Sequence, residues 1–189
     1  MASLALQTGD LFSIVTTGDG RARKSLLDWP KLGATHVDYA ADTPAQRNLW
    51  AVRLDEAVRR ADKPVLLVAD GESCFATAWW ARLSPASYVA RVAGALLFAP
   101  HERGDPARFA SPRGSLPFPS TVIDRSARLD RRTLAIAQGW GSELLERGWE
   151  SPGDASGWQQ AQALMTRLTA HIVERRMRVA DALGVSLEG

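Results

Sequence analysis

The chain has a single cysteine and only three histidines among its 189 residues. One cysteine excludes an internal disulfide and suits a reducing compartment, so we expect a cytoplasmic protein. No apolar run reaches the length of a membrane-spanning helix, so no membrane association is expected. The amino-terminal segment has neither the basic start nor the long apolar core of a signal peptide. The scarcity of histidine also limits the residues that can act as a catalytic base.

The charges of the chain are nearly balanced. The formal net charge is +2 and the sequence pI is about 9.0. The basic residues are spread along the sequence rather than clustered, so nucleic acid is not an expected partner. Hydrophobic residues make up 46% and charged residues 23% of the chain, which is typical of a globular protein. The length predicts one domain over residues 1–189.

Apolar runs typical of buried strands alternate with helical patterns along the chain. We expect strands over 11–16, 35–39, 64–69, 92–99, 118–124 and 142–145. We expect helices over 44–61, 74–83 and 129–140, and a last one from about residue 157. This alternation predicts an α/β fold with a mainly parallel sheet flanked by helices.

Two further segments bear on function. The loop 100–117 is polar and rich in proline, glycine and arginine, and loops of this length are usually functional or mobile. The last helix carries an extension over about 170–185. Its apolar residues Val173, Met177 and Ala180 suggest a homodimer contact.

The segment 64–83 has the layout of a nucleophile elbow, in which a buried strand, a sharp turn and a helix follow one another. Such an elbow presents its hydroxyl two residues after the small residue that ends the strand, because only there does the turn lift the side chain into the cleft. Here that small residue is Ala69, which places Gly71 at the tip. The sequence therefore predicts an elbow without a serine.

Four segments in the same order resemble a known family. They are 64–69 with the helix residues Cys74, Ala76, Ala78 and Trp80, then 92–100, 116–122 and 137–144. Together they resemble the small α/β-hydrolase-fold serine hydrolases, the family of retinoblastoma-binding protein nine and YdeN. The resemblance implies a three-layer αβα sandwich with a mainly parallel sheet. It also implies a catalytic serine, aspartate and histidine in that chain order.

All three catalytic positions implied by the resemblance are replaced. The family's elbow, His-Ser-Leu-Gly-Cys, aligns without a gap on residues 70–74 and puts the nucleophile at Gly71. The acid falls on Ala127, and the histidine falls near Pro152. We therefore expect a catalytically degenerate hydrolase, a pseudoenzyme without cofactor or metal. It would keep its cleft for a small ligand or a protein partner.

An active esterase-like hydrolase is the alternative. Residues 71–75 nearly match the pattern G-x-S-x-G, which makes Ser73 a second candidate nucleophile, although Phe75 stands at the last glycine. Cys74 lies at a helix start, where the helix dipole lowers a thiol pKa, but an inert packed cysteine is the simpler interpretation. His101 follows a central strand at its carboxyl end and is the candidate base for either nucleophile.

Other residues are candidates for lining the cleft: Gly18, Asp19, Asp70, Glu72 and Asp124. The resemblance places the first two where the family has its oxyanion-hole loop. The three carboxylates flank the elbow tip or end a neighbouring strand, and grouped carboxylates can bind metal or transfer protons. Their spacing matches no known metal site, so the preferred interpretation is structural, with Arg125 or Arg128 as neutralising partner.

Overall fold

The structure is a computed structural model that describes residues 12–18, 34–101, 106–109, 114–124 and 130–145. Several sequence predictions fall outside these residues, namely those on Asp19, Ala127, Pro152, the charges Arg125 and Arg128, and the helical extension 170–185. The single-domain assignment and the homodimer contact therefore stay predictions.

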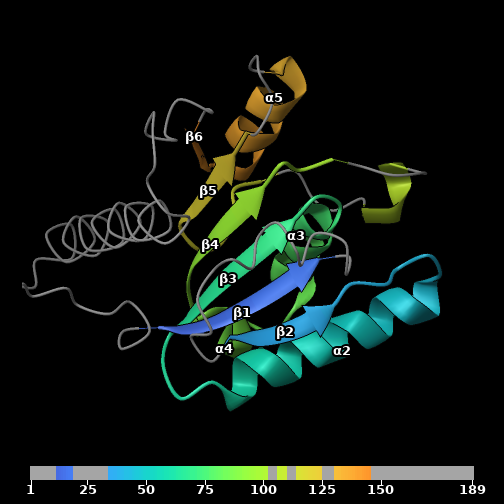
Figure 1. Cartoon of the computed structure of the whole chain (residues 1–189), viewed down its shortest axis with the longest axis vertical. Helices are drawn as coiled ribbons and strands as arrows, with labels where there is room; N and C mark the ends of the chain where they lie inside the picture. Colours follow the sequence, from blue (N-terminus) through green and yellow to red (C-terminus); the bar gives the residue numbers. More distant parts are fainter. Residues whose placement is uncertain (1–11, 19–33, 102–105, 110–113, 125–129, 146–189) are drawn as a thin grey trace, which may run out of the picture.

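Six parallel strands form one sheet in the order β2-β1-β3-β4-β5-β6. Their bounds are β1 Ser13–Gly18, β2 Thr35–Asp38, β3 Val65–Asp70, β4 Val92–Phe98, β5 Ser120–Ile123 and β6 Glu143–Leu145. Figure 1 shows them side by side, with β2 at one edge and β6 at the other. Because all strands run in the same direction, their carboxyl ends lie along one edge of the sheet, where ligands bind in open α/β folds.

Both faces of the sheet are buried, and the alternation of side chains along β3 shows how. Val65, Leu67 and Ala69 belong to one buried cluster, which also contains helix residues. Leu66 and Val68 belong to a second cluster on the opposite face. A central parallel strand buried on both faces reads as a continuous apolar run, which explains the sequence of β3.

In the part of the chain that the structure describes, four helices and one short 3-10 turn accompany the strands: α2 Pro44–Arg60, α3 Ser73–Leu83, α4 Ala86–Val89, η2 Pro106–Phe109 and α5 Arg131–Trp140. Thr43 begins α2 through a capping box with Gln46, since each side chain bonds the other residue's amide. The four α-helices contribute buried side chains to the larger cluster. They therefore pack on one face of the sheet, and Figure 1 shows α2 along the β2 side and α5 beside β5 and β6.

The elements predicted within the described residues are confirmed, with ends that coincide or differ by at most two residues. Two short elements were missed. Helix α4 has only four residues, too few for a periodic pattern. Turn η2 lies inside the predicted loop 100–117, and it carries Arg108, which pairs with Glu72 at the turn after β3.

Candidate functional site

The turn after β3 has the geometry of an elbow with glycine at its tip. Gly71 has φ +62°, a left-handed conformation that strains any residue with a Cβ atom. Its amide donates to the Phe98 carbonyl at 2.9 Å, which ties the tip to the end of β4. Helix α3 begins two residues later, at Ser73. The chain therefore makes the sharp strand-to-helix turn, and no side chain projects from its tip.

The ring of His101 lies in the space that a side chain at residue 71 would occupy. A Cβ atom added to Gly71 would be 2.6 Å from Cε1, 3.2 Å from Nδ1 and 3.4 Å from Nε2 of His101. The backbone reaches this position through Ala99, whose φ of +42° is the one positive value of a non-glycine residue in the described part of the chain. His101 itself is exposed to solvent. The imidazole and the elbow tip are thus in direct contact.

Ser73 is buried and its hydroxyl is fully engaged. The side chain is 1% exposed. Its Oγ lies 3.0 Å from the Thr17 carbonyl and 2.9 Å from the Asp70 carbonyl, and it accepts the Asp70 amide at 3.1 Å. These bonds join the ends of β1 and β3 beneath the turn. In this position the hydroxyl is shielded from solvent beneath the turn, which weighs against Ser73 as a nucleophile.

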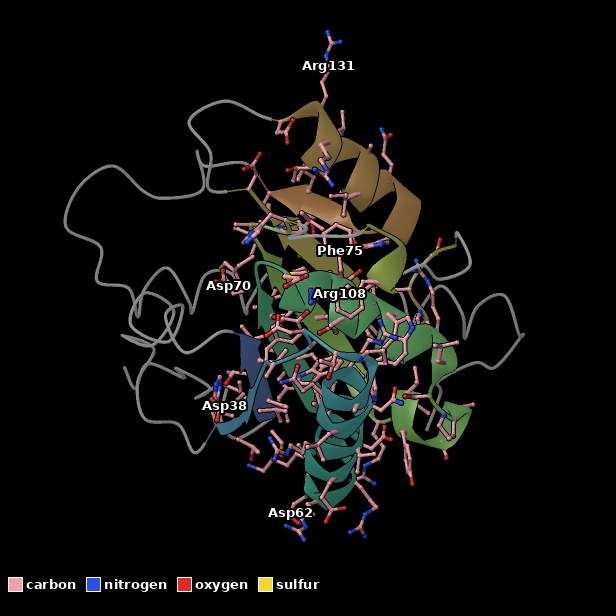
Figure 2. The ribbon with its side chains drawn as sticks, turned by 90° about the vertical axis from the view of Figure 1, so that its right-hand side faces the viewer. Asp38, Asp62, Asp70, Phe75, Arg108 and Arg131 are labelled. Atoms are coloured by element: carbon pink, nitrogen blue, oxygen red, sulfur yellow. The ribbon has the colours of Figure 1, made fainter. Side chains whose placement is uncertain are left out.

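Glu72 follows the elbow tip and pairs with an arginine from the loop after β4. Its Oε1 accepts Arg108 Nη1 at 2.7 Å, and the two side chains are only 12% and 18% exposed. Asp42 adds a second, longer contact to Arg108 at 3.4 Å. Burial and the charge of Glu72 raise the pKa of Tyr39 well above its usual range, so that phenol stays protonated. Arg108 is labelled in Figure 2, beside the start of α3.

Aromatic rings and a second arginine support this ion pair. Arg47 donates to the Arg108 carbonyl at 2.5 Å. The Arg47 guanidinium lies 5.4 Å from the centre of the Trp79 ring and 6.0 Å from that of Phe109. Phe109 also packs against Tyr39, with ring centres 6.4 Å apart. Turn η2 is therefore held between α2 and α3 at the first turn of the elbow helix.

The sequence missed this cluster, because Arg108 and Phe109 stand in a loop with no periodic pattern. The predicted neutralising partners, Arg125 and Arg128, lie outside the described residues, whereas Arg108 neutralises Glu72. The only sequence feature that pointed to this cluster was an arginine followed by an aromatic residue, Arg108 and Phe109, near the centre of the predicted loop 100–117. It gave no indication of which carboxylate would be the partner.

The predicted carboxylates Glu72 and Asp124 have different partners. Glu72 is bound to Arg108. Asp124 is 6% exposed, and its Oδ2 accepts the Asp130 amide at 3.3 Å, so it supports the start of α5. Within the described residues no three acidic, histidine or cysteine side chains are arranged to hold a metal ion.

Gly18, another predicted cleft residue, ends β1, and its carbonyl accepts the Tyr39 amide at 3.1 Å.

Comparison with known proteins agrees with this architecture. A family model described as serine hydrolase matches residues 28–170, well over half of the sequence. The chain belongs to the serine hydrolase family. The crystal structure of a YdeN-like hydrolase from Pectobacterium atrosepticum aligns with a TM-score of 0.62, covering 87% of this chain and 94% of that one at 15% identity. Among curated proteins, no relative matches the sequence. The predicted resemblance and the α/β-hydrolase-type three-layer sandwich are thus confirmed.

In this member of the serine hydrolase family, Cys74 is a buried thiol beneath the elbow. It is completely buried and donates from Sγ to the Phe98 carbonyl at 3.4 Å. Burial, with the negative charge of Asp70, raises the pKa of the thiol well above its ordinary value. Desolvation outweighs the helix dipole at this thiol, which weighs against the alternative in which Cys74 is a reactive nucleophile. The simpler interpretation, a packed cysteine beneath the elbow, agrees with these contacts.

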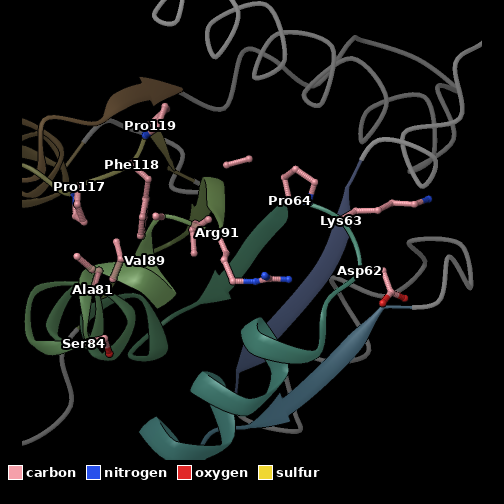
Figure 3. A pocket seen from close by; sticks show the side chains of 14 residues that line it. Asp62, Lys63, Pro64, Ala81, Ser84, Val89, Arg91, Pro117, Phe118 and Pro119 are labelled. Atoms are coloured by element: carbon pink, nitrogen blue, oxygen red, sulfur yellow. The ribbon is translucent and has the colours of Figure 1, made fainter.

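The hollow shown in Figure 3 lies at the opposite end of the sheet from the elbow. This cavity of about 830 Å³ is lined by Pro64 and Val92 at the amino ends of β3 and β4, with Arg91 and Phe118 beside them. Arg91 is anchored there, since its guanidinium donates to the Val58 carbonyl at 3.1 Å and to the Ala61 carbonyl. This hollow is separate from the elbow of the serine hydrolase scaffold.

No helix in the described ranges is both long and apolar enough to cross a membrane. The expected cytoplasmic location stays a prediction.

Proposed function

We propose that this chain is a catalytically degenerate serine hydrolase that binds a small ligand or a protein partner at its elbow. The observation that carries the proposal is the contact between Gly71 and His101. The elbow tip has no side chain, and an imidazole ring fills the place of one.

The serine mechanism needs an exposed hydroxyl within hydrogen-bond reach of a base. Ser73 is the hydroxyl closest to the tip in sequence, and it is 1% exposed with backbone partners on two strands. Cys74 is buried with a raised pKa, so it offers no thiolate. Loss of the nucleophile lowers the turnover of a serine hydrolase by about a millionfold. These features favour binding over turnover.

The test uses a fluorophosphonate probe, which forms a covalent adduct only with an activated serine. We expect no labelled serine in the full-length protein after tryptic digestion and mass spectrometry. The variants Ser73→Ala and Cys74→Ala should hydrolyse p-nitrophenyl esters at the wild-type rate. Ser87→Ala, a change at an exposed serine away from the elbow, is the matched control. A phosphonyl group on Ser73 would show that the chain is an active enzyme.

A further inference from the structure

The position of His101 depends on two left-handed residues on neighbouring strands. Gly71, after β3, has φ +62°, and Ala99, after β4, has φ +42°. A non-glycine residue adopts positive φ only where its surroundings enforce it, and such residues concentrate at functional sites. The Ala99 amide donates to the Ile123 carbonyl of β5 at 2.8 Å, which fixes this turn to the sheet. The sheet therefore holds the imidazole over the elbow tip.

The hydrogen bond of the ring also fixes its tautomer. Nδ1 of His101 lies 3.1 Å from the carbonyl oxygen of Ala99. A carbonyl oxygen only accepts, so Nδ1 carries the proton. In the neutral ring Nε2 then holds its lone pair, as the base does in a catalytic triad whose second nitrogen is bonded to an orienting oxygen. Because His101 is exposed, this lone pair is available to a molecule bound at the elbow.

We infer that His101 is itself the reactive group of this site, a nucleophile toward activated acyl compounds such as aryl esters and thioesters. The inference rests on the proposed function, because it requires that no serine takes this role. Ser73 and His101 do not form a pair, since the Ser73 hydroxyl is bonded to backbone beneath the turn. Among the described residues, the imidazole occupies the space of a side chain at the elbow tip, where the resemblance places the family's nucleophile.

The chemistry has two steps. In the first, the Nε2 lone pair attacks the carbonyl carbon, the bond from that carbon to the leaving oxygen or sulfur breaks, and the leaving group departs with the bonding electrons. The ring then loses its Nδ1 proton to the leaving anion, which gives a neutral acylimidazole and an alcohol or thiol. In the second step water adds to the acyl carbon and releases the carboxylic acid, and the ring recovers its proton.

Two measurements on the full-length protein test this inference. The first is nitrophenolate release from p-nitrophenyl acetate by the wild type and by the variants His101→Gln, His36→Gln and Ser73→Ala. His36 is the matched control, because its ring nitrogens face Thr16 and Asp38 instead of the elbow. The second is carbethoxylation by diethyl pyrocarbonate, which leaves a stable mark that peptide mass spectrometry assigns to one histidine. It needs no variant.

We expect nitrophenolate release to fall at least tenfold in His101→Gln and to stay unchanged in His36→Gln and Ser73→Ala. Carbethoxylation of His101 should be at least tenfold faster than that of N-acetylhistidine. An unchanged rate in His101→Gln, or reactivity no greater than that of N-acetylhistidine, would overturn the inference and leave the proposed function standing. A loss of release in Ser73→Ala, in a variant whose His101 still reacts with diethyl pyrocarbonate at the wild-type rate, would instead overturn the proposed function, and the inference with it.

Discussion

The substitution Gly71→Ala tests the elbow geometry most directly. It adds one methyl group at the tip, where φ is +62°. The new Cβ would lie 2.6 Å from Cε1 of His101, closer than two such carbon atoms approach without displacement. Two separate penalties therefore arise, one from the backbone and one from the imidazole.

The size of each penalty follows from its origin. An L-residue in the left-handed region costs about 1–2 kcal/mol. The imidazole is exposed and rotates away at a cost of about 0.5–1.5 kcal/mol if it leaves its rotamer. Alanine also restricts the unfolded chain, which returns about 0.4–1 kcal/mol. We expect Gly71→Ala to lower the free energy of unfolding by about 1–2 kcal/mol, most of it from the backbone.

Urea unfolding, followed by tryptophan fluorescence, measures this loss in a double-mutant cycle with His101→Ala. Removal of the ring should recover less than half of the loss. Gly141→Ala is the matched control, because Gly141 has φ +63° and its Cβ would lie 2.7 Å from Oγ of Ser115. Gly139→Ala is the opposite control, since this helical glycine has open space around it and alanine should stabilise by up to about 1 kcal/mol.

Two results would refute the reasoning. Wild-type stability of Gly71→Ala would mean that the turn is not left-handed at this residue, so the elbow would be placed wrongly. Full recovery in the double variant would mean that the ring, and not the backbone, disfavours a side chain at the tip.

Three further predictions concern the residues around the turn. Arg108→Met leaves Glu72 nearly buried without its partner, and should lower the free energy of unfolding by about 1.5–3 kcal/mol in urea titrations, an effect absent if the pair is solvated. Ser73→Ala removes a buried hydroxyl bonded to the Thr17 carbonyl and should cost about 1–3 kcal/mol; thermal unfolding at the wild-type midpoint would contradict its structural role. Cys74 binds its proton more tightly in the folded than in the unfolded chain, so its stabilisation is complete below the thiol's ordinary pKa of 9.0 and is lost as the pH rises above it. Cys74→Ala should therefore show a shallower loss of stability above pH 9, and the wild-type thiol should not react with a disulfide reagent at pH 8 until the protein unfolds.

The sequence predicted the sheet well because β3 and β4 are continuous apolar runs bounded by turn residues. Such runs have few alternatives to a strand buried on both faces. The observed strand ends differ from the predicted ones where polar residues continue the hydrogen bonding between strands. Strand β1 extends to Gly18 instead of ending near residue 16, because its threonines pair with β2 and β3. The hydrophobic pattern of one segment does not show which distant strand will pair with it.

The candidate site was predicted in part. The turn at Gly71 could be located, because a strand and a helix on either side define its length. The contact with His101 could not, because it depends on the left-handed backbone of Ala99, a residue type that gives no signal for that conformation. The partner of Glu72 was missed for a similar reason, since Arg108 is set by how a long loop folds back. Long-range contacts from irregular segments are what the sequence alone leaves undetermined.

The glycine at the elbow tip also bears on evolutionary reversibility. Glycine adopts the left-handed turn without strain, so a lineage that carries it loses nothing in stability at this position. A mutation back to serine would meet two obstacles at once, a strained backbone and an imidazole in the required space. It would also lack an acid and a base at the positions Ala127 and Pro152 that the family resemblance assigns. A return to the serine mechanism would therefore require changes at several positions together.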